Sequence, residues 1–166
     1  GGISVASQSG NFVSSFLNYS QQSGVGIARA ISAGNATQIS VENFLQYFAS
    51  DDDTKVALTY IENVGNGESL LQAMKHITAV KPLVVLKGGA TAAGSKAAQS
   101  HTGAMASNDR VFLGATRSAG AIKVSSVEGA FDTAATFATQ PLPRGRRVAV
   151  LTTVGGWGVV TADAIA

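Results

Sequence analysis

The fold is decided first by residues 3–22, which read ISVASQSGNFVSSFLNYSQQ. The short apolar run Ile3–Ala6 is typical of a buried β-strand. From Asn11 to Gln22 apolar side chains recur at helical spacing, at Phe12, Val13, Phe16, Leu17 and Tyr19. Only a short polar turn of small residues separates the two patterns. A strand that passes directly into an amphipathic helix is the repeating unit of an α/β protein.

The same alternation continues outward from this stretch as far as residue 139. Further strands are predicted at Val25–Ala33, Lys55–Ile61, Pro82–Leu86 and Ala121–Val124. Helices are predicted at Val41–Ala49, Gly67–Val80, Asp109–Ala119 and Val127–Thr139. Near-continuous apolar strands between helices indicate a parallel sheet that is covered on both faces. Because crossovers are right-handed, the expected fold class is α/β with a doubly wound parallel sheet, flavodoxin-like or Rossmann-like.

Composition excludes several classes of protein. The chain has 166 residues, 45% of them hydrophobic and only 13% charged, which argues against disorder. It has no cysteine, so a disulfide framework is impossible and a reducing, cytoplasmic location is expected. No apolar run is long enough to span a membrane. A net charge of +2 with 7% aromatic residues is too weak a signal for nucleic acid, so neither nucleic acid nor membrane is an expected partner.

A break in the pattern lies at residues 140–145, which contain two of the three prolines. It predicts a first domain over residues 1–143 and a further segment over residues 144–166. Within that segment, Arg146–Thr153 has a strand pattern and the glycine-rich run around Trp157 leads into a helix. One interpretation is a linker and the first βα unit of a second α/β domain that is cut short. The other is that Arg146–Thr153 forms the last strand of the same sheet.

Polar and small residues gather where four predicted strands end. They are Ser7–Asn11, 33–35, Glu62-Asn63 and Lys87-Gly88-Gly89. In an open parallel sheet the ligand site lies beyond the carboxyl ends of the strands. We therefore expect these four turns to meet at one edge of the sheet and to form a site.

The turn at Ser7, Ser9 and Gly10 is a candidate phosphate site. The start of a helix presents free N–H groups that attract an anion, and Gly10 allows backbone angles that other residues avoid. A second interpretation is that Ser9 or Asn11 simply caps the helix. Neither a Walker A pattern nor a G-x-G-x-x-G fingerprint follows a strand, so direct nucleotide or NAD binding has no support here.

His101 is the candidate nucleophile. It lies in a Gly-, Ala- and Ser-rich stretch, residues 88–107, in which Met105 is the one large apolar residue, and this stretch is predicted to form an active-site loop. An imidazole can act as a base, a ligand or a phosphoryl acceptor. The other histidine, His76, lies off the apolar stripe of its helix and is interpreted as solvent-exposed. No second His or Cys stands at ligand spacing from His101, so no metal site is expected.

Glu62 ends a buried strand with a carboxylate. Such a group can orient an imidazole and favour its nucleophilic tautomer. It can equally be a solvated acid at the end of a strand, and the sequence leaves both interpretations open.

Eight short motifs together resemble the NDP-forming acyl-CoA synthetases, relatives of the succinyl-CoA synthetase alpha subunit. In chain order they are Ser7–Gly10, residues 32–35, the turn Asp51–Thr54, Tyr60-Ile61-Glu62, Lys81-Pro82, Lys87-Gly88-Gly89, Ser100-His101-Thr102-Gly103-Ala104 and Gly155-Gly156-Trp157-Gly158. The resemblance runs along nearly the whole chain. It implies a flavodoxin-like CoA-ligase domain over the first 140 or so residues, followed by the start of a second ligase domain.

The resemblance implies a reaction and roles for residues. The family makes acyl-CoA from a carboxylic acid, CoA and ATP through an acyl phosphate and a phosphohistidine. His101 matches the phosphorylated residue, and Glu62 matches the acid that orients it. The helix start that stabilises the phosphohistidine matches Ser7, Ser9 and Gly10, and the glycine loop of the neighbouring domain matches Gly155, Gly156 and Gly158. The family often has proline where this chain has Trp157.

The resemblance also implies partners. We expect no cofactor in this stretch itself, and CoA, ATP or ADP, and Mg²⁺ in the full enzyme. A CoA-binding Rossmann domain and ATP-grasp domains, on the same chain or on another subunit of a homo- or hetero-oligomer, would complete the reaction, so the stretch alone would be inactive. Two alternatives are a non-catalytic, synthetase-like regulatory module of a protein acetyltransferase and a flavodoxin-type module that binds FMN.

Overall fold

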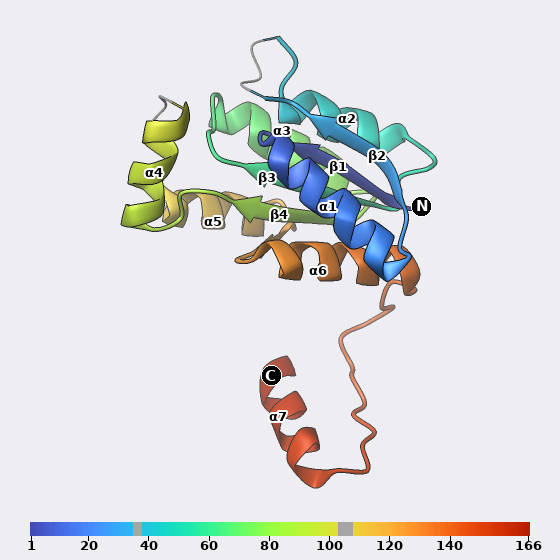
Figure 1. Cartoon of the computed structure of the whole chain (residues 1–166). Coiled ribbons are helices and arrows are strands. Elements are labelled where there is room, and N and C mark those ends of the chain that lie inside the picture. Colours follow the sequence, from blue (N-terminus) through green and yellow to red (C-terminus); the bar gives the residue numbers. More distant parts are fainter. Residues whose placement is uncertain (35–37, 103–107) are drawn as a thin grey trace.

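The computed structural model describes residues 1–34, 38–102 and 108–166, without the side chains of Gln99, His101 and Thr102. Apart from one helix within residues 88–107, the elements alternate as the sequence predicts through residue 139, close to the expected bounds (Figure 1). The strands are β1 (Ile3–Ser7), β2 (Ile27–Ser32), β3 (Val56–Ile61), β4 (Leu83–Lys87) and β5 (Ile122–Val124). The helices are α1 (Gly10–Ser23), α2 (Val41–Ser50), α3 (Gly67–Thr78), α4 (Ala92–Thr102), α5 (Asp109–Ser118), α6 (Val127–Thr139) and α7 (Gly155–Ile165).

The strands form one parallel sheet in the order β2-β1-β3-β4-β5. This is the strand order of flavodoxin-like folds, so the predicted doubly wound α/β class is confirmed. The chain first adds β2 on one side of β1 and then returns to add β3 on the other side. The strand order therefore reverses between β1 and β3, where Ser7 is in register with Tyr60. Ligands of this fold class bind outside the carboxyl ends of the strands at that reversal.

Each face of the sheet has its own apolar core. On one face α1 and α6 cover a cluster that includes Phe16, Leu58 and Phe131, and on the other α2, α3 and α5 cover a cluster that includes Leu45 and Met74. Figure 1 shows α1 and α6 together on the near face and α2 and α3 on the far face. Burial on both faces explains why every residue of β1, β3 and β4 is buried.

The helix ends follow local chemistry. The helix α1 ends at Gly24, whose φ of 73° is left-handed and favours glycine. At the start of α3 the Asn66 side chain accepts a hydrogen bond from the Ser69 N–H at 2.9 Å. The Asn108 side chain caps α5 in the same way by accepting from the N–H groups of Arg110 and Val111. These local interactions fix the end of α1 and the starts of α3 and α5.

The prediction of a loop over residues 88–107 is wrong for its middle part, because residues 92–102 form α4. Alanine is the strongest helix former, and this stretch contains several alanines and no proline. The absence of large apolar side chains, from which we inferred a loop, instead leaves α4 without a core face. The helix therefore projects beyond the sheet edge (Figure 1). Residues 103–107 lie outside the described residues.

The strand predicted at Arg146–Thr153 does not form, either in this sheet or beside it. Residues 144–154 are exposed and have no regular structure. A strand needs a neighbour to satisfy its backbone groups, and no other described strand pairs with this segment. The helix α7 forms as predicted, but it stands apart from the sheet in Figure 1.

Across the described residues, no helix combines the length and the apolar character that crossing a membrane requires.

Candidate functional site

The carboxyl ends of the strands meet as the sequence predicts. The Ala33 N–H donates to the Ser7 carbonyl at 2.7 Å, which joins the ends of β2 and β1. The Gly88 N–H donates to the Ile61 carbonyl at 2.9 Å, which joins the ends of β4 and β3. Asn35 lies outside the described residues. The described parts of all four turns share one edge of the sheet.

Gln8 joins the two turns on either side of the strand reversal. Its side-chain oxygen accepts from the N–H groups of Glu62 at 2.7 Å and Asn63 at 2.9 Å. Its side-chain N–H₂ donates to the Asn63 carbonyl at 2.9 Å, and its backbone N–H donates to the Tyr60 carbonyl at 3.1 Å. The Gln8 side chain thus pairs with three backbone groups just beyond the end of β3, namely the N–H groups of Glu62 and Asn63 and the carbonyl of Asn63. The turn before α1 and the backbone at Glu62 are held as one unit.

The start of α1 presents free backbone donors toward this edge. Ser9 is the N-cap residue, but its side chain makes no capping hydrogen bond, and the first turn contains no acidic residue. Within the described residues no acceptor meets the N–H groups of Gly10, Asn11 and Phe12. Simple capping by Ser9 is therefore not what this turn does. Free N–H groups and the positive end of the helix dipole together favour an anion.

Ser7 and Gly10 shape this helix start in different ways. The Ser7 hydroxyl is buried, accepts from the Ser9 N–H at 3.0 Å and donates to the Ser9 carbonyl at 2.7 Å, so it holds the turn. Gly10 does not have the unusual backbone angles that we expected, because its φ is not positive. A Cβ at Gly10 would lie 3.5 Å from the Ser32 hydroxyl, an ordinary contact. What Gly10 provides is open access to the first helical turn.

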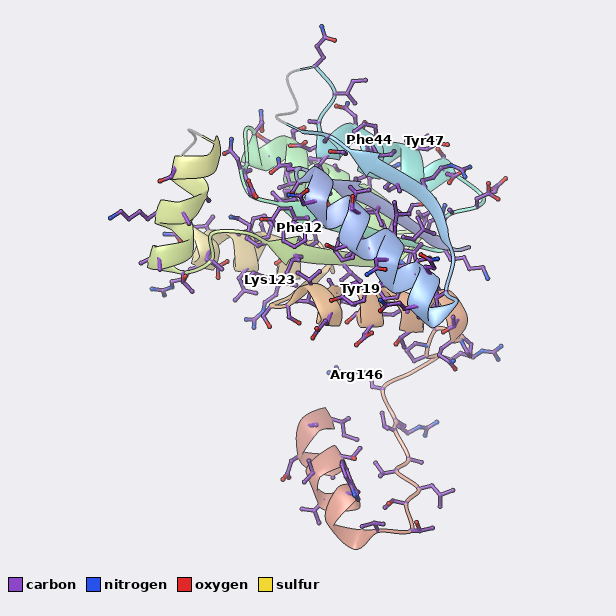
Figure 2. The ribbon with its side chains drawn as sticks, in the orientation of Figure 1. Phe12, Tyr19, Phe44, Tyr47, Lys123 and Arg146 are labelled. Carbon is purple, nitrogen blue, oxygen red and sulfur yellow. The ribbon has the colours of Figure 1, made fainter. Side chains whose placement is uncertain are left out.

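Glu62 directly follows β3 and lies against Tyr60, two residues earlier in the chain. The Tyr60 hydroxyl donates to the Glu62 Oε1 at 2.7 Å. Burial of Tyr60, together with the hydrogen bond to the Glu62 carboxylate, raises the pKa of the phenol above its ordinary value. The Tyr60 ring packs on Phe12 of α1, with ring centroids 4.1 Å apart. Phe12, labelled near the start of α1 in Figure 2, packs against the core cluster that contains Tyr60.

Lys87 supports the other side of the same turn. Its ammonium group donates to the Glu62 carbonyl at 3.0 Å and to the Gly88 carbonyl, and it lies 5.7 Å from the centre of the Phe112 ring. The side chain is buried, and this burial lowers the pKa of the ammonium group, with Asp109 acting in the opposite direction. Lys87 therefore fixes the backbone after β3 and β4 rather than reaching out to solvent.

The backbone of His101 lies in the last turn of α4, which follows β4 and stands at the carboxyl end of the sheet (Figure 1). Its side chain, and residues 103–107 after it, lie outside the described residues, so its contacts are not part of this geometry. The other histidine, His76, is exposed in the last turn of α3, as predicted. Gly155, Gly156 and Gly158 open α7 and are not brought together with the start of α1.

Three side chains of this edge had no role assigned from the sequence. They are Gln8, Tyr60 and Lys87. For Tyr60 a signal existed, because residues two apart on a strand share a face and Glu62 is two residues further on. The partners of Gln8 and Lys87 lie 54 and 25 residues away in sequence, so no local pattern reveals them.

The described residues contain no group of three or more His, Cys, Asp or Glu side chains placed to hold a metal ion.

Comparison with protein-family models decides the family. The model described as the succinyl-CoA ligase like flavodoxin domain matches residues 1–137. The chain belongs to this family. Its sheet order and the polar edge described above are thus those of a succinyl-CoA ligase-like flavodoxin domain, and the resemblance inferred from the motifs is confirmed.

Individual relatives of this succinyl-CoA ligase-like chain are ADP-forming CoA ligases. It is 40% identical over 166 residues to an ADP-forming acetate–CoA ligase I of Archaeoglobus fulgidus, covering 99% of this chain and 24% of that protein. It is 32% identical to the alpha subunit of acetate–CoA ligase I of Pyrococcus furiosus, covering 99% of this chain and 36% of that subunit. The chain therefore spans about a quarter to a third of the length of these relatives.

A solved structure agrees with this family membership over the whole described fold. The acetyl-coenzyme A synthetase 1 of Ca. Korarchaeum cryptofilum, solved in complex with phosphate and ADP, is similar with a TM-score of 0.91 and 32% identity. The match covers 98% of this chain and 36% of that one. It includes the segment after residue 140.

Proposed function

We propose that this chain is the phosphoryl-carrying domain of an NDP-forming acyl-CoA synthetase, an acid–thiol ligase. His101 would accept the phosphoryl group, Glu62 would orient the imidazole, and the turn formed by Ser7, Ser9 and Gly10 would bind the phosphoryl oxygens. The observation that carries the proposal is the join made by Gln8. It ties the turn before a helix start with free N–H groups to the backbone of Glu62, at the strand reversal of a domain from a family of CoA ligases.

The proposed chemistry moves one phosphoryl group through two displacements. A neutral imidazole nitrogen of His101 attacks the γ-phosphorus of ATP, so that an N–P bond forms while the bond to the ADP oxygen breaks. A carboxylate oxygen of the acid then attacks the same phosphorus, the N–P bond breaks, and an acyl phosphate forms. Finally the CoA thiolate attacks the acyl carbon and inorganic phosphate leaves. Each step is reversible, and the imidazole returns unchanged.

The residues of the described edge suit the anionic stages of this sequence. A phosphoryl group on an imidazole carries negative charge, which free helix-start N–H groups stabilise. A carboxylate that accepts the N–H of one ring nitrogen leaves the opposite nitrogen as the nucleophile. Glu62 is fixed from both sides by the Gln8 and Lys87 bonds to its backbone. The edge would thus supply an anion site and an orienting carboxylate on two turns that Gln8 joins.

The rest of the enzyme would come from other domains or subunits. A CoA-binding Rossmann domain and ATP-grasp domains would supply CoA and nucleotide with Mg²⁺, and the substrate would be a small carboxylic acid. We propose that residues 1–143 are one domain and that residues 144–166 begin the next, where Gly155, Gly156 and Gly158 would form a second phosphate-binding helix start. The exposed apolar residues of this segment, such as Leu151, are suited to packing against such a domain.

Labelling with γ-³²P-ATP tests the proposal on the full-length protein with its other domains. We expect acid-labile, base-stable label on His101, located by mass spectrometry of peptides prepared at alkaline pH. Addition of acetate or another small acid with CoA should remove the label and produce acyl-CoA. A folded, full-length protein that takes up no such label would refute the ligase function. Bound flavin absorbance instead would support the FMN-binding alternative.

Replacing Asn11 by Asp tests the anion site at the start of α1. Asn11 is exposed in the first turn, and Asp has almost the same shape but adds one negative charge. The charge interacts favourably with the helix dipole, so the variant should be more stable by about 0.3–1 kcal/mol. The same charge repels the negatively charged phosphoryl group. We therefore expect phosphorylation of His101 to slow by about 10-fold, which corresponds to a rise of roughly 1.4 kcal/mol in the activation free energy.

The matched control for this substitution is Asn18→Asp, which adds the same charge to an exposed position further along α1. Its phosphorylation rate should equal that of the wild type, since a dipole effect falls off within the first turn. Urea unfolding and single-turnover labelling measure the two effects separately. If both variants label equally fast, the start of α1 does not bind the phosphoryl group.

A further inference from the structure

Tyr60 lies between the two parts of the proposed phosphoryl site. Its hydroxyl donates to the Glu62 carboxylate at 2.7 Å, and its ring contacts Phe12 in the first turn of α1 with centroids 4.1 Å apart. Tyr60 is 7% exposed and belongs to the apolar core between the sheet, α1 and α6. A tyrosine that is packed on one side and bonded at its tip has little freedom to move.

The space around this hydroxyl is shaped by Gly88. A Cβ at Gly88 would lie 2.6 Å from the Tyr60 hydroxyl oxygen and 3.0 Å from the Glu62 Cγ. The first distance is shorter than real Cβ contacts allow, so any larger residue would push the Tyr60–Glu62 pair from its position. Gly88 has no positive φ, so its backbone does not require glycine. The glycine is needed for the room that it leaves to this pair.

We propose that Tyr60 is a positioning residue for Glu62. By donating to Oε1, the hydroxyl holds the carboxylate in one orientation, and the ring ties that orientation to the helix start through Phe12. The inference rests on the proposed function, because Glu62 is there the group that orients His101. Tyr60 itself does not touch a reacting atom. Its effect is to decide which way the imidazole is held, and therefore which ring nitrogen attacks phosphorus.

The protonation state of Tyr60 suits this role. Burial and the neighbouring carboxylate raise the pKa of the phenol, so the hydroxyl stays protonated throughout the neutral range. The Tyr60 hydroxyl can therefore always donate its hydrogen bond to Glu62, whereas a water molecule at the same place could rotate and lose this hydrogen bond. The Glu62 carboxylate therefore has a fixed partner at Oε1 before any ligand binds.

Tyr60→Phe in the full-length protein removes only the hydroxyl. We expect single-turnover phosphorylation of His101 to slow by about 10-fold, within the range seen when partners that orient a functional side chain are removed. The KM values for nucleotide and CoA should not change, because these ligands would bind on other domains. Tyr19→Phe is the matched control. Tyr19 is a half-buried tyrosine of the same core that stacks on Phe131 and has no hydrogen bond at the site, so it should label at the wild-type rate.

The decisive measurement is the isomer of phosphohistidine, resolved by ³¹P NMR of the labelled protein. The wild type should carry phosphate on a single ring nitrogen, whereas Tyr60→Phe should carry it on both. A merely structural loss would reduce the amount of label without mixing the isomers. If Tyr60→Phe labels at the wild-type rate with one isomer, the positioning role is refuted and the ligase function stands. Absence of label on wild-type His101 would overturn both.

Gly88→Ala supplies an independent route to the same result. It keeps the Tyr60 hydroxyl but places a methyl group against it, so slow labelling and mixed isomers are again expected. Gly114→Ala in α5 is the control, because a Cβ there meets nothing within 4 Å. Should Tyr60→Phe fail to fold, the comparison of these two alanine variants decides the proposal. Equal labelling rates and a single isomer in both would contradict it.

Discussion

His101→Ala is expected to abolish the acid-labile phosphoryl label of the full-length protein and to lower acyl-CoA formation by at least about 10³-fold. This is the largest effect expected of any single substitution, because the imidazole is the group that would form and break the N–P bond. No neighbouring side chain of the described edge is a comparable nucleophile, since Lys87 is buried and donates to two backbone carbonyls. Circular dichroism should show an unchanged fold, because α4 contributes no buried apolar side chain to either core.

The control for this experiment is built into the chain, which has only two histidines. His76 is exposed in the last turn of α3, away from the carboxyl edge of the sheet. His76→Ala should therefore retain the full label and the full rate of acyl-CoA formation. Label that persists in His101→Ala and disappears in His76→Ala would assign the phosphoryl group to the wrong end of the molecule and refute the site.

Phe16→Ala should destabilise the domain by about 3–5 kcal/mol, the range measured for Phe-to-Ala changes in protein cores. Phe16 is the buried residue of α1, with 0% exposure, and it packs between the helix and the sheet. Its loss removes the apolar contact that seats α1, and domains of this size are stable by only about 5–15 kcal/mol. Because α1 carries the proposed phosphate-binding turn, labelling should fall together with stability.

Leu17→Ala, one residue further along α1, is the control for this loss. Leu17 is 46% exposed, and alanine is an even better helix former, so its stability should change by no more than about 0.5 kcal/mol. Urea unfolding followed by far-ultraviolet circular dichroism measures both variants. Tryptophan fluorescence is a poor probe of this core, because Trp157 is exposed on α7. A Phe16→Ala variant as stable as Leu17→Ala would mean that α1 is not held by core packing.

Much of the candidate site was predictable because it depends on local order. A strand, a short polar turn and a helix at residues 3–23 identify a helix start, and Glu62 directly follows a buried strand. In a parallel sheet such turns share one edge whatever the strand order, so their convergence follows from local patterns alone. Of the two interpretations left open for this turn, capping by the Ser9 side chain does not occur, because the buried Ser7 hydroxyl holds the turn.

The wrong predictions have a common physical cause. The loop expected over residues 88–107 and the strand expected at Arg146–Thr153 were both inferred from the kind of side chains present. In α4, alanine-rich composition forms a helix without a core to pack on. At residues 146–153, β-branched apolar residues form no strand because no neighbour pairs with them. Composition states what a segment prefers, and the available neighbours decide whether that preference is realised.

By itself, the sequence determined the alternation of strands and helices through residue 139 except for α4, the parallel sheet covered on both faces and the family of the chain. These depend on residue periodicity and on motifs that are read within a few positions. Only the tertiary structure decided that Gln8 bonds to the backbone of Glu62 and Asn63, and that Lys87 closes the same turn. It also decided that Tyr60 contacts both Glu62 and Phe12. Apart from the Tyr60–Glu62 pair, these contacts join residues far apart in the chain, and their geometry exists only once the sheet has placed β1, β3 and β4 side by side.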